Sequence, residues 1–292
     1  MNINITALTD VGKERATNED AVIVCPDIEK QNWYENSSNA YLPLGRYGAL
    51  MVVADGMGGA NAGEIASSIT VETMKLFFAR KLFHNFINTE QNAYKLLSEA
   101  IRLSHEAIME HVIDDPDSIG MGTTVVITWI IEGVAYVAWC GDSRCYCFNQ
   151  RDGMKQLTKD HSYVQELVDK GEITAKQAFA HPDGNIITKC LGDGDVNIEP
   201  DMITYQINDG DVLLSCSDGL CGYCDNKSIG KVLLNRFDDL TACRDELLEL
   251  AMKAGGQDNI SIALCATLPN NEKAPCLTLS TKIKRFIYKV FG

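Results

Sequence analysis

Short apolar runs recur along the chain, and this recurrence limits the fold more than any other feature of the sequence. The runs are rich in β-branched residues and are bounded by glycine and aspartate, which is typical of β-strands. Two turn signals, Glu132-Gly133 and Asp152-Gly153, lie between neighbouring runs and predict antiparallel hairpins. The strands are expected at Ile3–Thr9, Ala21–Cys25, Ala49–Ala54, Thr123–Ile131, Val134–Cys140, Arg144–Asn149, Met154–Leu157, Val212–Cys216 and Ile260–Thr267.

Helical periodicity is confined to separate stretches. Apolar side chains recur at helical spacing from Ile65 to Leu76 and from Leu97 to Val112, and a further helix is expected at Asp238–Lys253. Helices therefore come in pairs between groups of hairpin-linked strands, whereas a doubly wound parallel sheet would alternate single helices with strands. The pattern predicts an α+β protein in which helices cover antiparallel sheets.

Composition excludes several classes of function. Of the 292 residues, 46% are hydrophobic and 23% are charged, which is ordinary for a globular protein. The formal net charge of −14 disfavours binding to nucleic acid, because an acidic surface repels phosphate backbones. The apolar runs are too short to cross a bilayer, and the first residues do not resemble a secretory leader. Eleven cysteines without a regular framework predict reduced thiols, so we expect a cytoplasmic protein.

Carboxylates gather at turns and at the ends of predicted strands. A single Asp-Gly dipeptide is most often a plain turn. Several carboxylates at neighbouring strand ends would repel one another and raise one another's pKa, so a cation is expected among them. Oxygen ligands suit Mg²⁺ or Mn²⁺ better than zinc. The acidic motifs are Asp10–Asp20, Asp55–Gly59, Ser217–Gly219 and Gly255–Asn259.

Seven motifs in a fixed order carry a resemblance to a known family. They are DxGxxRxxNED (Asp10–Asp20), DGMGG (Asp55–Gly59), MGTT (Met121–Thr124), GDSR (Gly141–Arg144), LTKDHS (Leu157–Ser162), CSDGL (Cys216–Leu220) and GGQDNIS (Gly255–Ser261). The set resembles the metal-dependent serine/threonine protein phosphatases of the 2C type, and DGMGG is similar to the bacterial branch. The resemblance implies two antiparallel β-sheets packed face to face and flanked by pairs of helices, an αββα sandwich. It also implies a phosphatase catalytic domain over residues 1–267.

The resemblance assigns the metal ligands residue by residue. Asp55 matches the carboxylate that bridges two Mn²⁺ or Mg²⁺ ions, and the Gly56 carbonyl matches a ligand of one of them. Asp218 and Asp258 match direct ligands of the other ion. Asp142, in GDSR, matches a residue that helps to hold a third, weaker ion in bacterial relatives.

Other matched residues surround these ligands. Glu19 and Asp20 match positions that hold metal-bound waters, and Asn259 follows the last metal-binding aspartate as it does in the family. Arg15 matches the arginine that binds the substrate phosphate, for which its planar fork is well suited. Met57 stands where animal members carry a histidine proposed as the general acid. His161 and His181 lie near or within the family's variable flap, and the general acid stays unassigned between them.

The implied activity is hydrolysis of phosphoserine and phosphothreonine on proteins. A water molecule bridging the two ions would attack the phosphate directly, without a covalent enzyme intermediate. The enzyme would reverse a serine/threonine kinase. The alternative is a catalytically weak relative that acts as a phosphoprotein-binding regulatory module. Every direct metal position is filled in this chain, which favours the enzyme.

Two cysteine patterns offer competing chemistry. Cys145 and Arg151 have the C-x5-R spacing of a cysteine phosphatase, but the segment between them lacks glycine and alternates like a strand. Cys216, Cys221 and Cys224 have the spacing of an iron–sulfur ligand set, but Asp218 falls inside it. We interpret both patterns as packing cysteines.

The segment 268–292 differs from the rest of the chain. It holds five basic residues and one glutamate, and Ile283, Phe286, Ile287 and Val290 share one helical face. Basic amphipathic helices bind anionic membrane surfaces or partner proteins. Residues 281–291 could make such a contact, or the helix could pack against its own acidic domain. The oligomeric state is not specified by the sequence.

Overall fold

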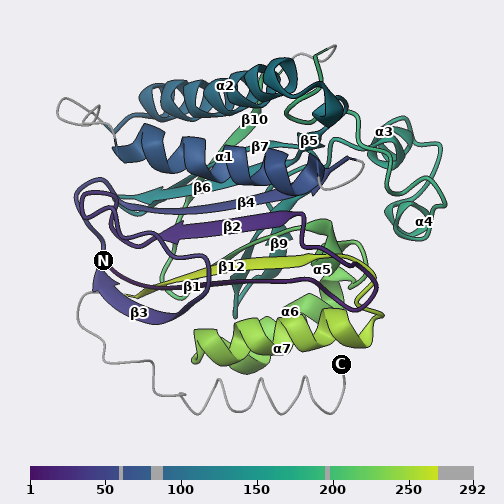
Figure 1. The fold of residues 1–292 in the computed structure, drawn as a ribbon. Helices are drawn as coiled ribbons and strands as arrows, with labels where there is room; N and C mark the ends of the chain where they lie inside the picture. Colours follow the sequence, from purple (N-terminus) through teal and green to yellow (C-terminus); the bar gives the residue numbers. More distant parts are fainter. Residues whose placement is uncertain (59–61, 80–87, 195–197, 269–292) are drawn as a thin grey trace.

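A computed structural model of the chain describes residues 1–58, 62–79, 88–194 and 198–268. Two antiparallel β-sheets pack face to face, and a pair of helices covers the outer face of each (Figure 1). The predicted α+β class and the two-sheet sandwich are confirmed. Among the described residues, no helix has the length and apolar character that crossing a membrane requires. The segment 268–292 lies almost entirely outside the described residues.

The first sheet, called sheet I, contains both the first and the last strand of the described chain. β1 pairs with β12 over the full length of both strands, from Asn2 opposite Leu268 to Asp10 opposite Ile260. The strand order is β3 (Ser37–Pro43), β1 (Asn2–Asp10), β12 (Ile260–Leu268), β11 (Val212–Cys216), β8 (Arg144–Asn149) and β9 (Gly153–Gln156).

The second sheet, sheet II, is built around the predicted hairpin at Glu132-Gly133. Both turn residues have positive φ angles, as a tight hairpin of this kind requires. The order is β10 (Asp201–Gln206), β7 (Val134–Cys140), β6 (Val125–Ile131), β4 (Ala49–Met57) and β2 (Asp20–Cys25), and β5 (Gly122–Thr123) pairs with the end of β4. The run predicted as one strand from Thr123 to Ile131 is therefore two strands, separated at Thr124.

The helices lie where their apolar faces can be buried. α1 (Ala62–Ala79) and α2 (Glu90–Asp114) cover sheet II, and α6 (Asn226–Arg236) and α7 (Leu240–Lys253) cover sheet I. The third predicted helix is α7, which begins after the Asp239 cap rather than at Asp238. The remaining helical segments are η2 (Pro116–Ser118), α3 (Tyr163–Asp169), α4 (Ala175–Phe179) and α5 (Asp218–Cys221).

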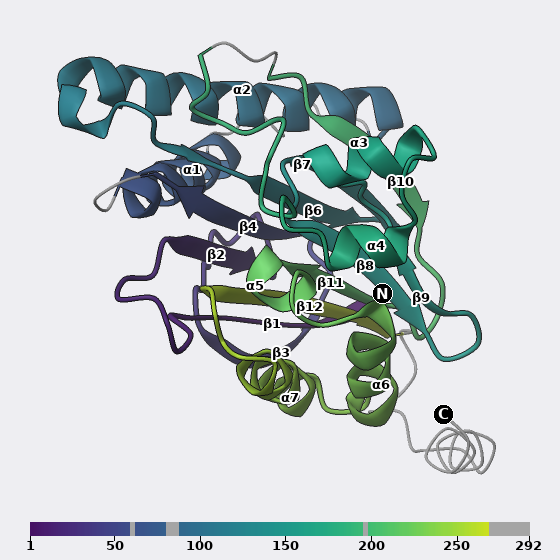
Figure 2. The same ribbon diagram turned by 90° about the vertical axis from the view of Figure 1, so that its right-hand side faces the viewer.

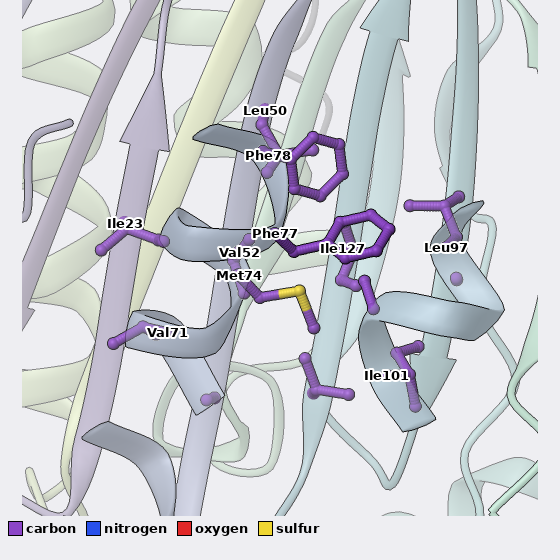
Figure 3. Close-up of a cluster of buried hydrophobic side chains, with 14 of the residues drawn as sticks. Ile23, Leu50, Val52, Val71, Met74, Phe77, Phe78, Leu97, Ile101 and Ile127 are labelled. Atoms are coloured by element: carbon purple, nitrogen blue, oxygen red, sulfur yellow. The ribbon is translucent and has the colours of Figure 1, made fainter. Parts of the chain in front are cut away.

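Three layers of apolar side chains join these elements. Ile5, Val53 and Val137 belong to the layer between the two sheets. A second layer fills the space between sheet II and the helices α1 and α2, and Figure 3 shows Met74, Phe77 and Phe78 of α1 in it. There Phe78 packs edge-on against Trp129. A third lies beneath α6 and α7. Central strands are buried on both faces, which explains why they form continuous apolar runs in the sequence instead of alternating ones.

Candidate metal centre

The acidic motifs meet at one end of the sandwich, beside α5. Asp20 and Asp55 are directly paired residues of β2 and β4 in sheet II. Asp218 is the first residue of α5, immediately after β11 of sheet I, and Asp258 lies two residues before β12. Asp142 lies in the turn between β7 and β8. The structure thus brings together carboxylates from both sheets, which are far apart in the sequence.

Asp20 is buried and is held between the sheets by a serine. The Ser217 hydroxyl donates a 2.7 Å hydrogen bond to the Asp20 carboxylate, and it accepts one of 2.9 Å from the Ser261 backbone N–H. Burial raises the pKa of Asp20 to about 7, although the bond from Ser217 partly offsets this. Ser217 was not among the predicted site residues, and its place between Cys216 and Asp218 was the available signal.

Asp55 and Asp218 are partly exposed, but protein surrounds both carboxylates. Burial is the main cause that raises the pKa of each, to about 6 for Asp218. The charges of neighbouring aspartates, Asp20 first, raise the pKa of Asp55 further, and the charge of Asp258 does the same for Asp218. Burial and Asp218 likewise hold the pKa of Asp142 well above its usual value. One oxygen of Asp142, Oδ1, is buried without a hydrogen-bond partner in the part of the chain that the structure describes.

This donor set fits divalent metal ions. Like-charged carboxylates with an unsatisfied buried oxygen are costly to keep ionised unless a cation compensates them. Mg²⁺ and Mn²⁺ prefer such oxygen ligands. Within the described ranges, no three acidic, histidine or cysteine side chains converge on a single point as a ready-made metal site. The ligands of individual ions are therefore proposals.

Gly56 is required by close packing at the end of β4. A Cβ atom there would lie 2.1 Å from the carbonyl oxygen of Gly63 in α1 and 2.5 Å from that of Glu19. Its own N–H donates to the Glu19 carbonyl oxygen at 3.1 Å. Only glycine therefore lets the strand end approach both neighbours, and the residue that follows Asp55 is held against α1 and the Glu19 backbone.

Arg15 lies at the rim of the carboxylate cluster. Its Nη2 donates a 2.8 Å hydrogen bond to Oδ2 of Asp258, and its side chain is 49% exposed. This hydrogen bond raises the pKa of the guanidinium. Arg15 thus carries a partly free guanidinium next to the predicted metal ligands, where an incoming anion can reach it.

Asn259 fastens the Asp10–Asp20 loop to β12. Its Nδ2 donates to the carbonyl oxygens of Val11 and Thr17, both at 2.9 Å, and its Oδ1 accepts from the Glu19 N–H at 2.8 Å. This loop carries Arg15, and burial raises the pKa of its Glu19. Asn259 acts on the site by positioning these two residues.

We expect Asn259→Ala to lower the free energy of unfolding by about 2 kcal/mol, because three hydrogen bonds are lost at a buried position. Urea denaturation would measure this change. Gln257→Ala is the matched control, since Gln257 is an exposed residue of the same motif and should change stability little. Equal effects of the two substitutions would contradict the positioning role.

The two histidines occupy different environments. His161 is mostly buried, its Nδ1 accepts a hydrogen bond of 3.0 Å from the N–H of Gly141, and its ring stacks on Trp139. Burial lowers the pKa of His161. His181 follows α4, and its Nδ1 accepts from the Asp183 N–H. The geometry links His161 to the turn that carries Asp142, and the general acid stays unassigned.

A largely buried arginine beside the site was also missed in the sequence. Arg144 Nε and Nη2 donate to the two carboxylate oxygens of Asp160 at 2.6–3.0 Å, and Nη1 donates to the Tyr146 hydroxyl at 3.0 Å. Arg144 also lowers the pKa of Asp142 and Asp218. Both members of the pair lie in matched motifs, GDSR and LTKDHS, which was the available signal.

The cysteines lie in the core rather than in a phosphate-binding loop. Cys145 is a fully buried residue of β8, and burial raises the pKa of its thiol to about 11. A reactive cysteine needs a lowered pKa and a partly exposed position. Cys216, Cys221 and Cys224 are also buried free thiols. These placements agree with the interpretation as packing cysteines.

Comparisons with known proteins identify the relatives of this chain. Residues 44–258 match the sequence model of the family described as Protein phosphatase 2C. Protein phosphatase PhpP of Streptococcus pneumoniae is 34% identical over 262 residues, which cover 90% of this chain and 96% of PhpP. The serine/threonine phosphatase stp of Listeria innocua is 32% identical over 88% of this chain and 92% of its own length.

Solved structures agree with these sequence matches. The serine/threonine phosphatase of S. agalactiae superposes with a TM-score of 0.77 at 32% identity, covering 91% of this chain and 99% of that one. The serine/threonine phosphatase PstP of Mycobacterium tuberculosis gives a TM-score of 0.75 at 29% identity, covering 92% and 100%. The catalytic domain of PstP in complex with two manganese ions gives a TM-score of 0.73 at 28% identity, covering 92% of this chain and 100% of that one.

Proposed function

The chain belongs to the protein phosphatase 2C family and is a metal-dependent serine/threonine protein phosphatase, and we propose that it removes phosphate from phosphoproteins with water as the nucleophile. It would thereby oppose a serine/threonine kinase. The observation that carries the proposal is the meeting of Asp20, Asp55, Asp142, Asp218 and Asp258 beside Arg15. This arrangement combines a binding site for cations with a binding site for a phosphate group.

The ligand assignments follow from how the carboxylates are placed. Asp55 and the Gly56 carbonyl would hold ions together with Asp218 and Asp258. Asp142, with its unpaired Oδ1, would help to hold a third ion. Mn²⁺ or Mg²⁺ bound by these residues would supply the charge that lowers the pKa of a water molecule and that neutralises negative charge developing on the phosphate.

The chain's own residues outside this set position the substrate and the site. Asp20 and Glu19 would accept hydrogen bonds from water molecules around the ions, and Ser217 fixes the orientation of Asp20. Arg15 would bind two phosphate oxygens with its planar fork, because its side chain is about half exposed. Arg144 supplies a largely buried positive charge that favours the ionised form of Asp142 and Asp218.

The direct test is phosphate release from a phosphothreonine peptide, measured with Mn²⁺ and with a chelator. We expect turnover only with the metal. A folded, Mn²⁺-loaded protein without turnover would instead support the alternative of a catalytically weak, phosphoprotein-binding regulatory module.

Substitution of Arg15 tests the phosphate contact. We expect Arg15→Ala to raise KM for the peptide about tenfold, since a charge-assisted hydrogen bond contributes about 1.5–3 kcal/mol. The KM of Arg15→Lys should lie between those of the wild type and Arg15→Ala, because lysine keeps the charge but loses the planar fork. A Mn²⁺ titration is the control, because removing a cation from Asp258 should not weaken metal binding. An unchanged KM would contradict the role.

The wider setting of the enzyme is also part of the proposal. The free, mostly buried cysteines support a cytoplasmic location, and the acidic net charge disfavours binding to nucleic acid. Phosphoproteins as partners follow from the phosphatase activity. The catalytic domain would comprise residues 1–267. The tail 268–292, with its apolar face and basic residues, would form a separate element that contacts a membrane surface or a partner through residues 281–291.

A further inference from the structure

A pocket with no role in the chemistry above lies between α6 and the turn that joins β8 to β9. Its volume is about 550 Å³, which is within the range of small-molecule sites. Phe148, Met154 and Leu234 supply apolar lining, and the charged residues Arg151 and Lys227 also line it. Arg144 is the first residue of β8, and the pocket lies at the other end of this strand. Figure 2 shows α6 next to the β8–β9 hairpin.

Gly230 keeps this pocket open. It lies in the interior of α6, where glycine is less favourable than alanine. A Cβ atom would meet Met154 only at 3.6 and 3.7 Å, which is ordinary contact, so packing does not require a glycine here. Gly230 is one of the lining residues. A larger side chain at position 230 would therefore extend into the pocket and would not clash with a neighbouring helix or strand.

The pocket lining carries one more positive than negative charge, although the whole chain has a net charge of −14. Arg151 and Lys227 are both exposed at the pocket, Asp152 also lines it, and Asp225 lies near Lys227 outside the lining. Apolar walls next to exposed cations are complementary to a ligand with an apolar body and an anionic group.

Hydrogen bonds connect the pocket to the metal centre. Asn226 lines the pocket, and its Oδ1 accepts from the buried Tyr146 hydroxyl at 3.2 Å. That hydroxyl accepts from Arg144, which holds Asp160 and approaches the carbonyl oxygen of Cys221 at 3.5 Å. Cys221 ends α5, the helix that begins with Asp218. A shift of α6 would therefore be transmitted to the residues around the carboxylates.

We propose that this pocket binds a small amphiphilic anion, an apolar body with one carboxylate, sulfonate or phosphate group, and that its occupancy changes turnover at the metal centre. The effect on turnover rests on the proposed phosphatase function, whereas the binding does not. Chain segments and protein partners are less suitable occupants: the basic segment 269–292 would meet like charges at Arg151 and Lys227.

The binding is tested with 8-anilinonaphthalene-1-sulfonate, titrated by fluorescence into the full-length, Mn²⁺-loaded protein. We expect one saturable site, and Gly230→Phe should weaken binding about tenfold or more because the ring fills the pocket. Lys155→Gln is the matched control, since Lys155 is an exposed residue of β9 outside the lining and should leave the titration unchanged. No binding by the wild type, or equal binding by Gly230→Phe, would overturn the site.

A second variant keeps the test independent of the folding of Gly230→Phe. Arg151→Gln combined with Lys227→Gln removes only exposed charges, and it should weaken the binding and reduce its dependence on salt. Unchanged affinity and salt dependence would overturn the anionic character of the ligand.

Turnover of the phosphothreonine peptide tests the connection to the metal centre. A saturating concentration of the same probe should change the rate of the wild type by about fivefold, the lower end of ordinary coupling between sites, and should not affect Gly230→Phe. An unchanged wild-type rate with the probe bound would overturn the connection. Failure of the proposed function is distinguishable, because turnover would then be absent without the probe while binding could still be measured.

Discussion

Asp218→Asn is expected to reduce metal-dependent phosphate release by about a thousandfold or more, and Asp55→Asn should do the same. Metal ions contribute several kcal/mol of charge stabilisation in phosphoryl transfer. Each 1.36 kcal/mol changes the rate about tenfold, so losing one ion is enough for this effect. Asparagine keeps the shape of the side chain but removes the charge that binds the ion. Phosphate release from the phosphothreonine peptide at saturating Mn²⁺ is the measurement.

The loss should not come from unfolding. Burial and like charges raise the pKa of both carboxylates, so removing one charge should leave the metal-free protein at least as stable as the wild type. Thermal unfolding with a chelator checks this. Asp209→Asn is the matched control, because Asp209 is exposed in the turn before β11 and should keep full activity. Retained activity in either site variant would contradict the proposed metal centre.

Without metal, the protein should lose stability as the pH rises from about 4 to about 7. The pKa of Asp218 is raised to about 6 and that of Asp20 to about 7, so the folded state binds more protons than the unfolded chain over this interval. Stability falls with pH wherever the folded state binds more protons. The expected loss is on the order of 3 kcal/mol, roughly what the Asp218 shift alone supplies. Urea denaturation in the presence of a chelator measures it.

Mn²⁺ should reverse this dependence. A cation binds the ionised carboxylates, so the stabilisation by the metal should increase over the same pH interval. Asp20→Asn should reduce the pH dependence of the metal-free protein, because one buried titrating group is removed. A metal-free stability that is constant or increases from pH 4 to 7 would contradict the raised pKa values.

The buried strands were predictable because burial on both faces leaves a continuous apolar run. β4 and β11 are of this kind, and both were expected where they occur. β3 and β10 were missed, although the other two edge strands, β2 and β9, were expected. β10 is only partly buried, so its sequence contains no continuous apolar run. The strand conformation of β3 and β10 comes from pairing with β1 and β7, which local sequence does not encode.

The candidate site was predictable one motif at a time. Sequence placed Asp55, Asp218 and Asp258 at strand ends, and the family resemblance gave each a role. It could not supply the contacts between the two sheets, such as the bond from Ser217 to Asp20. The motifs GDSR and LTKDHS contain Arg144 and Asp160, but the sequence could not show that these two residues form an ion pair, because a pair between different segments has no periodic signature.

The pairing of β1 with β12 has a consequence for how the chain is made on the ribosome. β1 has two neighbours in sheet I: β3 is translated soon after it, whereas β12 follows about 250 residues later. Because a domain folds as a unit, β1 completes its pairing only when β12 has emerged. Asp258, just before β12, is also delivered late. A nascent chain that stops before β12 would therefore lack an inner strand of sheet I and Asp258 of the proposed metal centre, and phosphatase activity would arise only after β12 has been translated.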